Sequence, residues 1–462
     1  MSIQRLHDRL DAAGRRAASN DTGLTMAEVI VALFVFTVFI LGLGYSLLSM
    51  TRLVSDSGNR EVAASLASQE IDRVRAIPDA FDVLSSTTTQ TVNGITYKIK
   101  RVAGWVTASG STASCGSGGG NLQDKAVDVQ VTWPSQYMLT SAIRSTTILA
   151  PTTRINDPSF GTIIVSVLGA DGAGRPGVTV TVTADSGSTG VSPGAVDSTD
   201  VTGCSYVLKV VPGAYHVTVS TASYVDIRQQ TSPSYAVVVP AGGSQTAPFS
   251  YDARATFNVA YASNYTGTGT VKLPAALATN FMSTTGLALL TTTTPTVQYL
   301  YPFADGYSTI AGNYADASSP NQCASVDPLL WPAGQVNGVN LAAGARPKTA
   351  VAAGSAGPIG VQMGVIQATW PAVSATSITI KNAAAPAGTG DPDCATPASY
   401  DYSFATTPAA GTAVYLAVPF GSWQVYSKLA STLTILPSGN VTNATQGEVT
   451  GNIITLDPRI PS

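Results

Sequence analysis

One carboxylate interrupts the most apolar stretch of the chain, and its chemistry requires a partner. The stretch from Leu24 to Met50 reads LTMAEVIVALFVFTVFILGLGYSLLSM, and Glu28 is its only charged residue. A carboxylate inside an apolar helix costs a few kcal/mol unless a cation neutralises it. We therefore interpret Glu28 as a functional residue.

Other residues that could carry chemistry are sparse. Any histidine metal site or Ser-His-Asp triad must use His7 or His216, the only two histidines. In the strand pattern around it, His216 shares a face with hydroxyl residues, so we expect a solvated histidine. Asp391 and Asp393 are too few for a calcium site, and we expect them in a solvated loop. The sequence shows no paired acidic motif and no nucleophile elbow, so we predict no enzymatic activity, no metal and no cofactor.

The four cysteines, Cys115, Cys204, Cys323 and Cys394, form no CxxC motif, which argues against zinc-ribbon and thioredoxin-type sites. Cys323 and Cys394 fall in one C-terminal unit, so our first choice pairs them and leaves Cys115 to bridge Cys204. Four cysteines allow three connectivities, and the sequence does not decide among them.

Charge excludes another class of function. Lys and Arg number 24 against 27 Asp and Glu, and charged residues make up 11% of the 462 residues, less than half the roughly 25% usual in globular proteins. No basic stripe is present, so we predict no nucleic-acid partner. The length favours two to four domains.

The apolar stretch is long enough to cross a bilayer, about 40 Å as a helix. Four arginines precede it and two follow it, which favours a cytoplasmic N-terminus; they are Arg5, Arg9, Arg15, Arg16, Arg52 and Arg60. A cleaved secretory signal fits poorly, because its apolar region is about 7–15 residues and ends at a small-residue site. An ordinary signal-anchor helix is the alternative.

The residues around Glu28 give a more specific interpretation. Gly23-Leu24-Thr25-Met26-Ala27-Glu28-Val29 resembles the type IV prepilin cleavage and methylation signature, with Gly23, Thr25 and Glu28 carrying the match. The resemblance implies a leader over residues 1–23, cleavage after Gly23 by a prepilin peptidase, N-methylation of Leu24, and pairing of Glu28 with the N-terminal amine of a neighbouring subunit.

Two positions depart from the family pattern. Leu24 stands where the family usually has Phe, and Ala27 stands where an aliphatic residue usually precedes the Glu. The leader is also longer than the shortest ones in the family.

The helix should continue beyond the membrane. Apolar residues recur at helical intervals as far as Ile77, and Pro78 disfavours further helix. We predict a helix over about 25–77, roughly 80 Å long. Alternating segments at 95–100, 127–133 and 143–149 predict three antiparallel strands that cover its C-terminal half as a pilin head, within a pilin-like part over 24–150. Residues 109–120 read as a loop.

Residues 159–250 read as a separate all-β unit. A strand over Gly161–Leu168, the alternating Val178–Thr183, the stretch Thr199–Cys204 and the V-P-G-x-Y-x-V stretch ending at Val217 follow one another. This order resembles the carboxypeptidase regulatory-like, prealbumin-type β-sandwich, which implies a spacer or binding module that is not catalytic.

Residues 252–462 are also β-rich. Strands are predicted around 255–260, 269–273, 378–381, 414–418, 423–428 and 453–456, and residues 342–358 read as an exposed loop. The stretch Val418–Val425 resembles the V-P-G-A-Y-H-V turn of the preceding unit with one insertion. A second sandwich of related topology and a merely analogous turn both remain open.

Together these features predict an α+β protein with a long N-terminal helix, a small β head and one or two sandwiches. The leading hypothesis is a minor pilin of a type IV pilus-like filament, held in the cytoplasmic membrane before assembly and on the cell surface after processing. Its partners would be prepilin peptidase and other pilin subunits; the ligand of the β domains stays open. The alternatives are a pseudopilin of a secretion or DNA-uptake system and a membrane-anchored surface adhesin that enters no filament.

Overall fold

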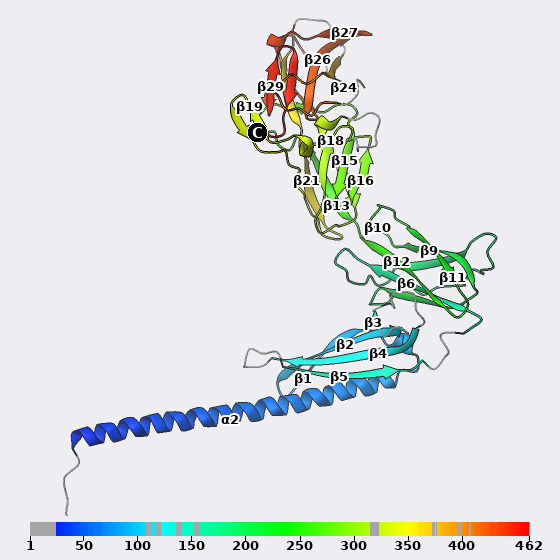
Figure 1. The fold of residues 1–462 in the computed structure, drawn as a ribbon, viewed down its shortest axis with the longest axis vertical. Coiled ribbons are helices and arrows are strands. Elements are labelled where there is room, and N and C mark those ends of the chain that lie inside the picture. The colour runs from blue at the N-terminus through cyan, green and yellow to red at the C-terminus, as the bar shows by residue number, and fades with distance from the viewer. Residues whose placement is uncertain are drawn as a thin grey trace, which may run out of the picture. The chain divides into compact units, whose positions relative to one another are not determined.

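The computed structural model describes residues 25–107, 112–113, 115, 122–134, 141–151, 157–314, 323–371, 375, 377–394, 400–405 and 408–461. The architecture is α+β, as predicted: one long N-terminal helix is followed by antiparallel and mixed sheets (Figure 1). The chain divides into two compact units. The first covers residues 1–78, 86–102 and 127–147, and the second covers 79–85, 103–126 and 148–462.

Helix α2 spans Met26–Arg75, close to the predicted range. Thr25 caps its N-terminus, and Arg73 and Arg75 in its last turn complement the helix dipole. Its 50 residues give a length of about 75 Å. The helix ends just before Pro78, where the proline ring disfavours a helical residue in front of it.

A five-stranded sheet follows the helix, where the sequence predicted three strands. Its strands are β1 (Ser86–Val92), β2 (Ile95–Thr107), β3 (Thr112–Ala113), β4 (Leu122–Trp133) and β5 (Ser141–Leu149), in the order β1-β2-β4-β5 with β3 paired to β2. The prediction missed β1 because its sequence STTTQTV is polar except for the final Val92 and shows no alternation. The predicted loop at 109–120 lies outside the described residues except Thr112, Ala113 and Cys115.

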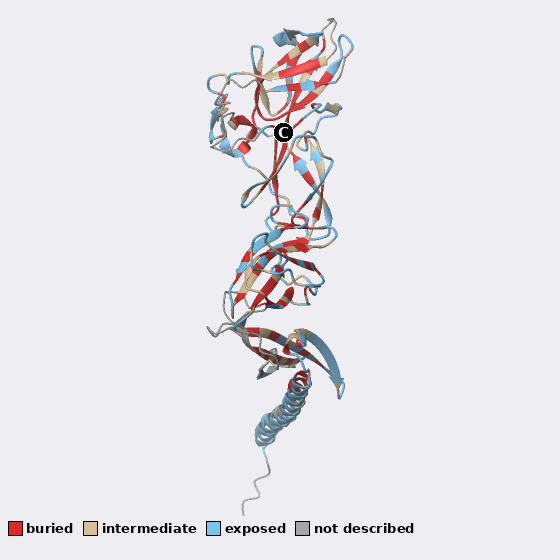
Figure 2. Ribbon diagram, turned by 90° about the vertical axis from the view of Figure 1, so that its right-hand side faces the viewer, coloured by how far each residue is buried: buried red, intermediate tan, exposed pale blue. Residues whose placement is uncertain are grey.

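Seven strands form a first sandwich: β6 (Gly161–Leu168), β7 (Thr179–Ala184), β8 (Cys204–Val210), β9 (Gly213–Ser220), β10 (Tyr224–Asp226), β11 (Ser234–Val239) and β12 (Ser244–Ala253). One sheet has the order β10-β12-β6-β8 and the other β11-β9-β7. Their facing side chains, among them Val165, Val217 and Tyr251, form one buried core. Figure 2 colours the buried residues of the ribbon red.

The C-terminal region has more than one core. A first core lies between the sheets β17-β13-β21 and β16-β15-β18, around Phe257 and Phe281. These sheets consist of β13 (Ala255–Tyr261), β15 (Thr279–Ser283), β16 (Gly286–Thr291), β17 (Val297–Leu300), β18 (Ser308–Ala311) and β21 (Ala356–Val361). The prediction of a loop over 342–358 is therefore wrong for its last three residues, because β21 begins at Ala356. A short hairpin joins β19 (Gly334–Val336) and β20 (Val339–Leu341).

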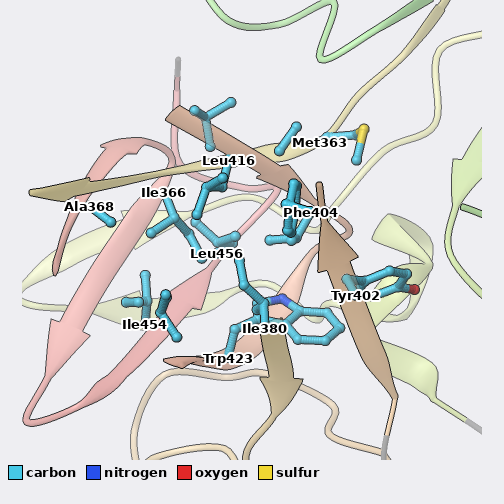
Figure 3. Close-up of a cluster of buried hydrophobic side chains, with 14 of the residues drawn as sticks. Met363, Ile366, Ala368, Ile380, Tyr402, Phe404, Leu416, Trp423, Ile454 and Leu456 are labelled. Carbon is cyan, nitrogen blue, oxygen red and sulfur yellow. The ribbon is translucent and has the colours of Figure 1, made fainter. Parts of the chain in front are cut away.

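A second C-terminal core lies between a four-stranded and a six-stranded sheet (Figure 3). The first has the order β14-β25-β22-β28, and the second has the order β24-β23-β26-β30-β29 with β27 paired to β26. Their strands are β14 (Val271–Lys272), β22 (Gly364–Thr369), β23 (Ser377–Asn382), β24 (Asp401–Phe404), β25 (Ala413–Val418), β26 (Gly421–Leu429), β27 (Thr432–Ile435), β28 (Val441–Thr445), β29 (Gly447–Thr450) and β30 (Ile453–Leu456).

The two sandwiches share a strand order. In the first, β8-β6-β12 faces β11-β9-β7; in the last, β25-β22-β28 faces β27-β26-β23. The V-P turns pass between the sheets in both cases, and an aromatic side chain bonds back to each turn. Tyr215 Oη donates to the Val211 carbonyl at 2.6 Å, and Trp423 Nε1 donates to the Pro419 carbonyl at 2.9 Å. The two sandwiches differ in the relative direction of one strand pair: β6 and β12 run parallel, whereas β22 and β28 run antiparallel. The last sandwich is therefore related to the first in strand order.

Candidate functional site

The start of α2 holds the two predicted assembly residues against each other. Thr25 and Glu28 form a capping box: Glu28 Oε2 accepts hydrogen bonds from the Thr25 amide and hydroxyl, both at 3.0 Å, and the Glu28 amide donates to Thr25 Oγ1 at 3.4 Å. This geometry turns the carboxylate back toward the chain that precedes the helix. The predicted cleavage and methylation residues, Gly23 and Leu24, lie outside the described residues.

The Glu28 carboxylate is exposed and has no cationic partner in the part of the chain that the structure describes. Oε1 likewise accepts no hydrogen bond from a described residue. A charge at this end of the helix is favoured by the helix dipole. The carboxylate can therefore accept an ammonium group from outside the described chain without breaking the helix cap.

The N-terminal half of α2 has no cover within the described residues. Large apolar side chains are exposed from Met26, which is 82% exposed, to Met50, which is 65% exposed, and Val54 is 73% exposed. Among the helices described, α2 alone is long and apolar enough to cross a membrane. An apolar surface of this extent needs lipid or protein around it.

The C-terminal half of α2 is covered. Its buried side chains recur every three or four residues and form one stripe: Ala63, Leu66, Ala67, Ile71 and Val74. On the sheet of the same unit, alternate residues such as Tyr97, Ile99 and Val129 are buried in turn. The helix and the sheet therefore bury complementary faces.

A buried ion pair joins this half of the helix to the sheet. Glu70 is 5% exposed, and its two oxygens accept from Arg73 at 2.7 Å and from Arg101 of β2 at 2.8 Å. Arg75 adds a hydrogen bond of 3.0 Å to the Thr147 hydroxyl of β5. Because a buried unpaired charge is costly, these contacts select one position of the helix along the sheet.

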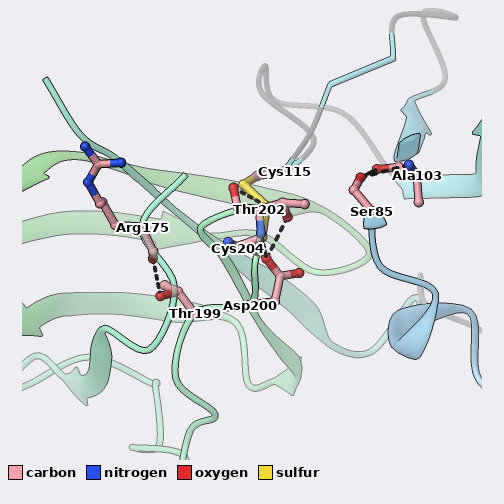
Figure 4. The surroundings of a disulfide bond; sticks show 8 residues. All are labelled: Ser85, Ala103, Cys115, Arg175, Thr199, Asp200, Thr202 and Cys204. Carbon is pink, nitrogen blue, oxygen red and sulfur yellow. Dashed lines mark hydrogen bonds between the residues drawn. A yellow bond between two sulfur atoms is a disulfide. The ribbon is translucent and has the colours of Figure 1, made fainter. Parts of the chain in front are cut away.

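The cysteines form two disulfides, Cys115–Cys204 and Cys323–Cys394, which is the pairing that the sequence analysis placed first. Residues Thr199–Cys204 form the turn that positions Cys204 for the first disulfide (Figure 4). Asp200 Oδ1 accepts from the amides of Thr202 and Cys204 at 2.8 and 3.0 Å. Gly203 has φ of +80°, and a Cβ there would lie 2.3 Å from the Val167 carbonyl oxygen, so only glycine fits.

An aromatic cluster surrounds the first disulfide. The rings of Phe81, Trp105 and Tyr206 lie with centroids 4.6 to 6.1 Å apart, and Ala80 and Ile164 complete the cluster with Cys115 and Cys204. Burial raises the pKa of the Tyr206 phenol well above its ordinary value. We call this group the joint cluster, because it packs Ala80, Phe81, Trp105 and Cys115 against strands β6 and β8 within the second unit.

Two polar residues that the sequence analysis weighed have defined partners. His216 is half exposed, as expected, and its Nε2 lies 3.3 Å from Asp185 Oδ1. Asp391 is not in a solvated loop, and that expectation was wrong: it accepts hydrogen bonds from the hydroxyls of Ser325 and Ser422. No cluster of three or more potential metal ligands occurs among the described residues.

The sequence matches no protein-family model and no curated protein. Among solved structures, it is similar to the Bacillus anthracis TIE protein, with 12% identity over 77% of this chain and 70% of that chain and a TM-score of 0.20. It is also similar to a streptococcal ancillary pilin, with 10% identity over 53% of this chain and 77% of that chain and a TM-score of 0.17.

Proposed function

We propose that the protein is a minor pilin-like subunit of a type IV pilus-like filament. A prepilin peptidase would cut after Gly23 and methylate Leu24, and the apolar half of α2 would then pack among other pilin helices. The β domains would be displayed at the surface, where they initiate assembly or contact other surfaces. Before assembly the chain would be anchored in the cytoplasmic membrane by α2.

The observation that carries the proposal is the division of α2 into two halves. One half buries an apolar stripe against the sheet of its own unit, whereas the other is apolar, exposed and begins at the Thr25–Glu28 capping box. In a plain anchor, a carboxylate at the start of the helix would serve only as a helix cap. In a filament subunit it has a second use, because pairing with the amine of a neighbouring chain selects one register between helices.

The experiment is coexpression with a prepilin peptidase, followed by N-terminal sequencing and mass measurement. We expect a chain that begins at N-methylated Leu24. Gly23→Ala should abolish cleavage. Glu28→Ala should leave cleavage intact but remove the chain from sheared surface filaments, whereas Glu61→Ala, which removes an exposed carboxylate from the covered half, should assemble normally.

A chain that keeps Met1 and tolerates Glu28→Ala would instead be a membrane-anchored adhesin, the second candidate. A processed chain recovered in a secretion or DNA-uptake complex rather than in surface filaments would be a pseudopilin. The cleavage assay separates the first of these from the proposal, and filament recovery separates the second.

A further inference from the structure

The outer face of one sheet in the first sandwich is divided into a covered part and an open part. At the start of β6, Ile164 belongs to the joint cluster. Farther along, Ser166 and Leu168 of β6 stand beside Pro248 and Ser250 of β12 in the parallel register. These four side chains alternate with core residues such as Val167, so they point away from the core and form the floor of a groove of about 360 Å³.

The wall of this groove comes from the segment between β10 and β11. Ile227, Arg228 and Gln230 line it, followed by Ser234 and Tyr235 at the start of β11. The volume falls within the range of about 300–1,000 Å³ that is usual for ligand sites.

The wall is held in place before any ligand arrives. Asp226 Oδ1 accepts from the amides of Arg228 and Gln230 at 2.9 and 2.7 Å. Gln229, between them, accepts from the Tyr301 amide at 2.7 Å and donates to Tyr307 Oη at 3.3 Å. A site fixed in this way loses little entropy when it binds a ligand.

The lining combines apolar and polar groups in the manner of a ligand site. Leu168, Ile227 and Tyr235 are 37 to 44% exposed, and Tyr235 packs edge-on against Phe249. The side chains of Arg228 and Gln230 form no hydrogen bond or ion pair with any residue that the structure describes. The groove thus presents an aromatic ring and aliphatic groups beside the hydrogen-bonding groups of Arg228 and Gln230, which have no side-chain partner among the described residues.

The chemistry points to a sugar. The cation of Arg228 is balanced by the carboxylate of Asp226, so the lining carries no net charge to select an anion. Pro248 in the floor has no N–H, which disfavours pairing with an extended peptide. A sugar ring presents C–H groups on one face and hydroxyls at its rim, which complement a tyrosine ring flanked by guanidinium, amide and hydroxyl groups.

We propose that this groove binds a neutral oligosaccharide. The inference names a class of ligand for the surface contact that the proposed function includes. It rests on that function only for the location of the module at the cell surface. Its binding chemistry does not depend on filament assembly.

The test is saturation-transfer NMR and calorimetry on the full chain in detergent micelles, with cellopentaose, maltopentaose and N-acetylglucosamine tetramer as probes. We expect at least one of them to bind. Tyr235→Ala and Gln230→Ala should each weaken that binding about tenfold, since each removes one contact. Val238→Ala, on the same strand but outside the groove lining, should leave it unchanged.

Absence of binding by all three sugars would overturn the inference, as would binding that neither groove variant weakens. Selective binding of an extended peptide would also overturn it. Binding by a chain that is never cleaved at Gly23 would support the sugar site while refuting the filament proposal, so the two failures are distinguishable.

Discussion

Removing the Cys115–Cys204 disulfide should loosen the joint cluster while leaving the last sandwich intact. The two cysteines are 89 positions apart, and both are almost fully buried. In the chain-entropy description, a cross-link closing a loop of this size stabilises the fold by about 4.6 kcal/mol at 25 °C. Cys115→Ala/Cys204→Ala should therefore lower the local free energy of opening by up to about 4–5 kcal/mol.

Hydrogen exchange followed by mass spectrometry is the suitable assay, because it reports stability segment by segment. Peptides covering Trp105, Ile164 and Tyr206 should lose protection in the double variant. Peptides covering Trp423 should not.

The second disulfide provides the matched control. Its cysteines are 71 positions apart, which corresponds to about 4.4 kcal/mol. Cys323→Ala/Cys394→Ala should affect the segment around Trp331 and spare Trp105. Unchanged protection at Trp105 in the first variant, or an equal loss of protection across both regions, would refute the reasoning that this disulfide stabilises the joint cluster.

Three further substitutions test individual contacts. Glu70→Ala removes the carboxylate that pairs with Arg101 and should lower the free energy of unfolding, measured by thermal melting, by about 3–5 kcal/mol, whereas Asp72→Ala, which changes an exposed neighbour, should alter it little; equal effects would contradict the role of the ion pair. Tyr215→Phe removes the bond to the Val211 carbonyl and should cost about 1–2 kcal/mol in denaturant unfolding; no change would mean that the turn does not depend on it. Burial raises the pKa of Asp391 above its ordinary value of 3.8, so its ionisation should lower the stability of the last sandwich as pH rises from that value through the raised pKa; Asp391→Asn should flatten this dependence in melting curves, and an unchanged slope would exclude Asp391 as its source.

Local patterns in the sequence predicted the regular elements well. Strand β6 has its predicted bounds, and α2 falls within two residues of its predicted ends, because periodicity and Pro78 act locally. Strand β1 was missed because a polar strand shows no alternation. Its turn signal was present, however: Asn93-Gly94 has positive φ at both residues, as a two-residue hairpin requires.

The contacts between distant segments could not be predicted in this way. Phe81, Trp105 and Tyr206 meet only after three elements have folded, and no spacing in the sequence announces that they share a cluster. The same holds for the groove, where Leu168 and Tyr235 come from different strands. The prediction for Asp391 failed for the same reason. An Asp-Pro-Asp stretch is typical of a solvated loop, and the sequence does not show that a distant serine hydroxyl donates to this carboxylate.

The parallel pairing of β6 with β12 has a mechanical consequence. These are the first and last strands of their sandwich, and seven residue pairs join them from Thr162–Ser244 to Leu168–Ser250. When a tether pulls on the two ends of a module built this way, the force runs along both strands in opposite senses and loads all of these hydrogen bonds in shear together. An antiparallel hairpin pulled at its open end would instead break its bonds one at a time. The first sandwich is thus arranged to transmit tension without unravelling.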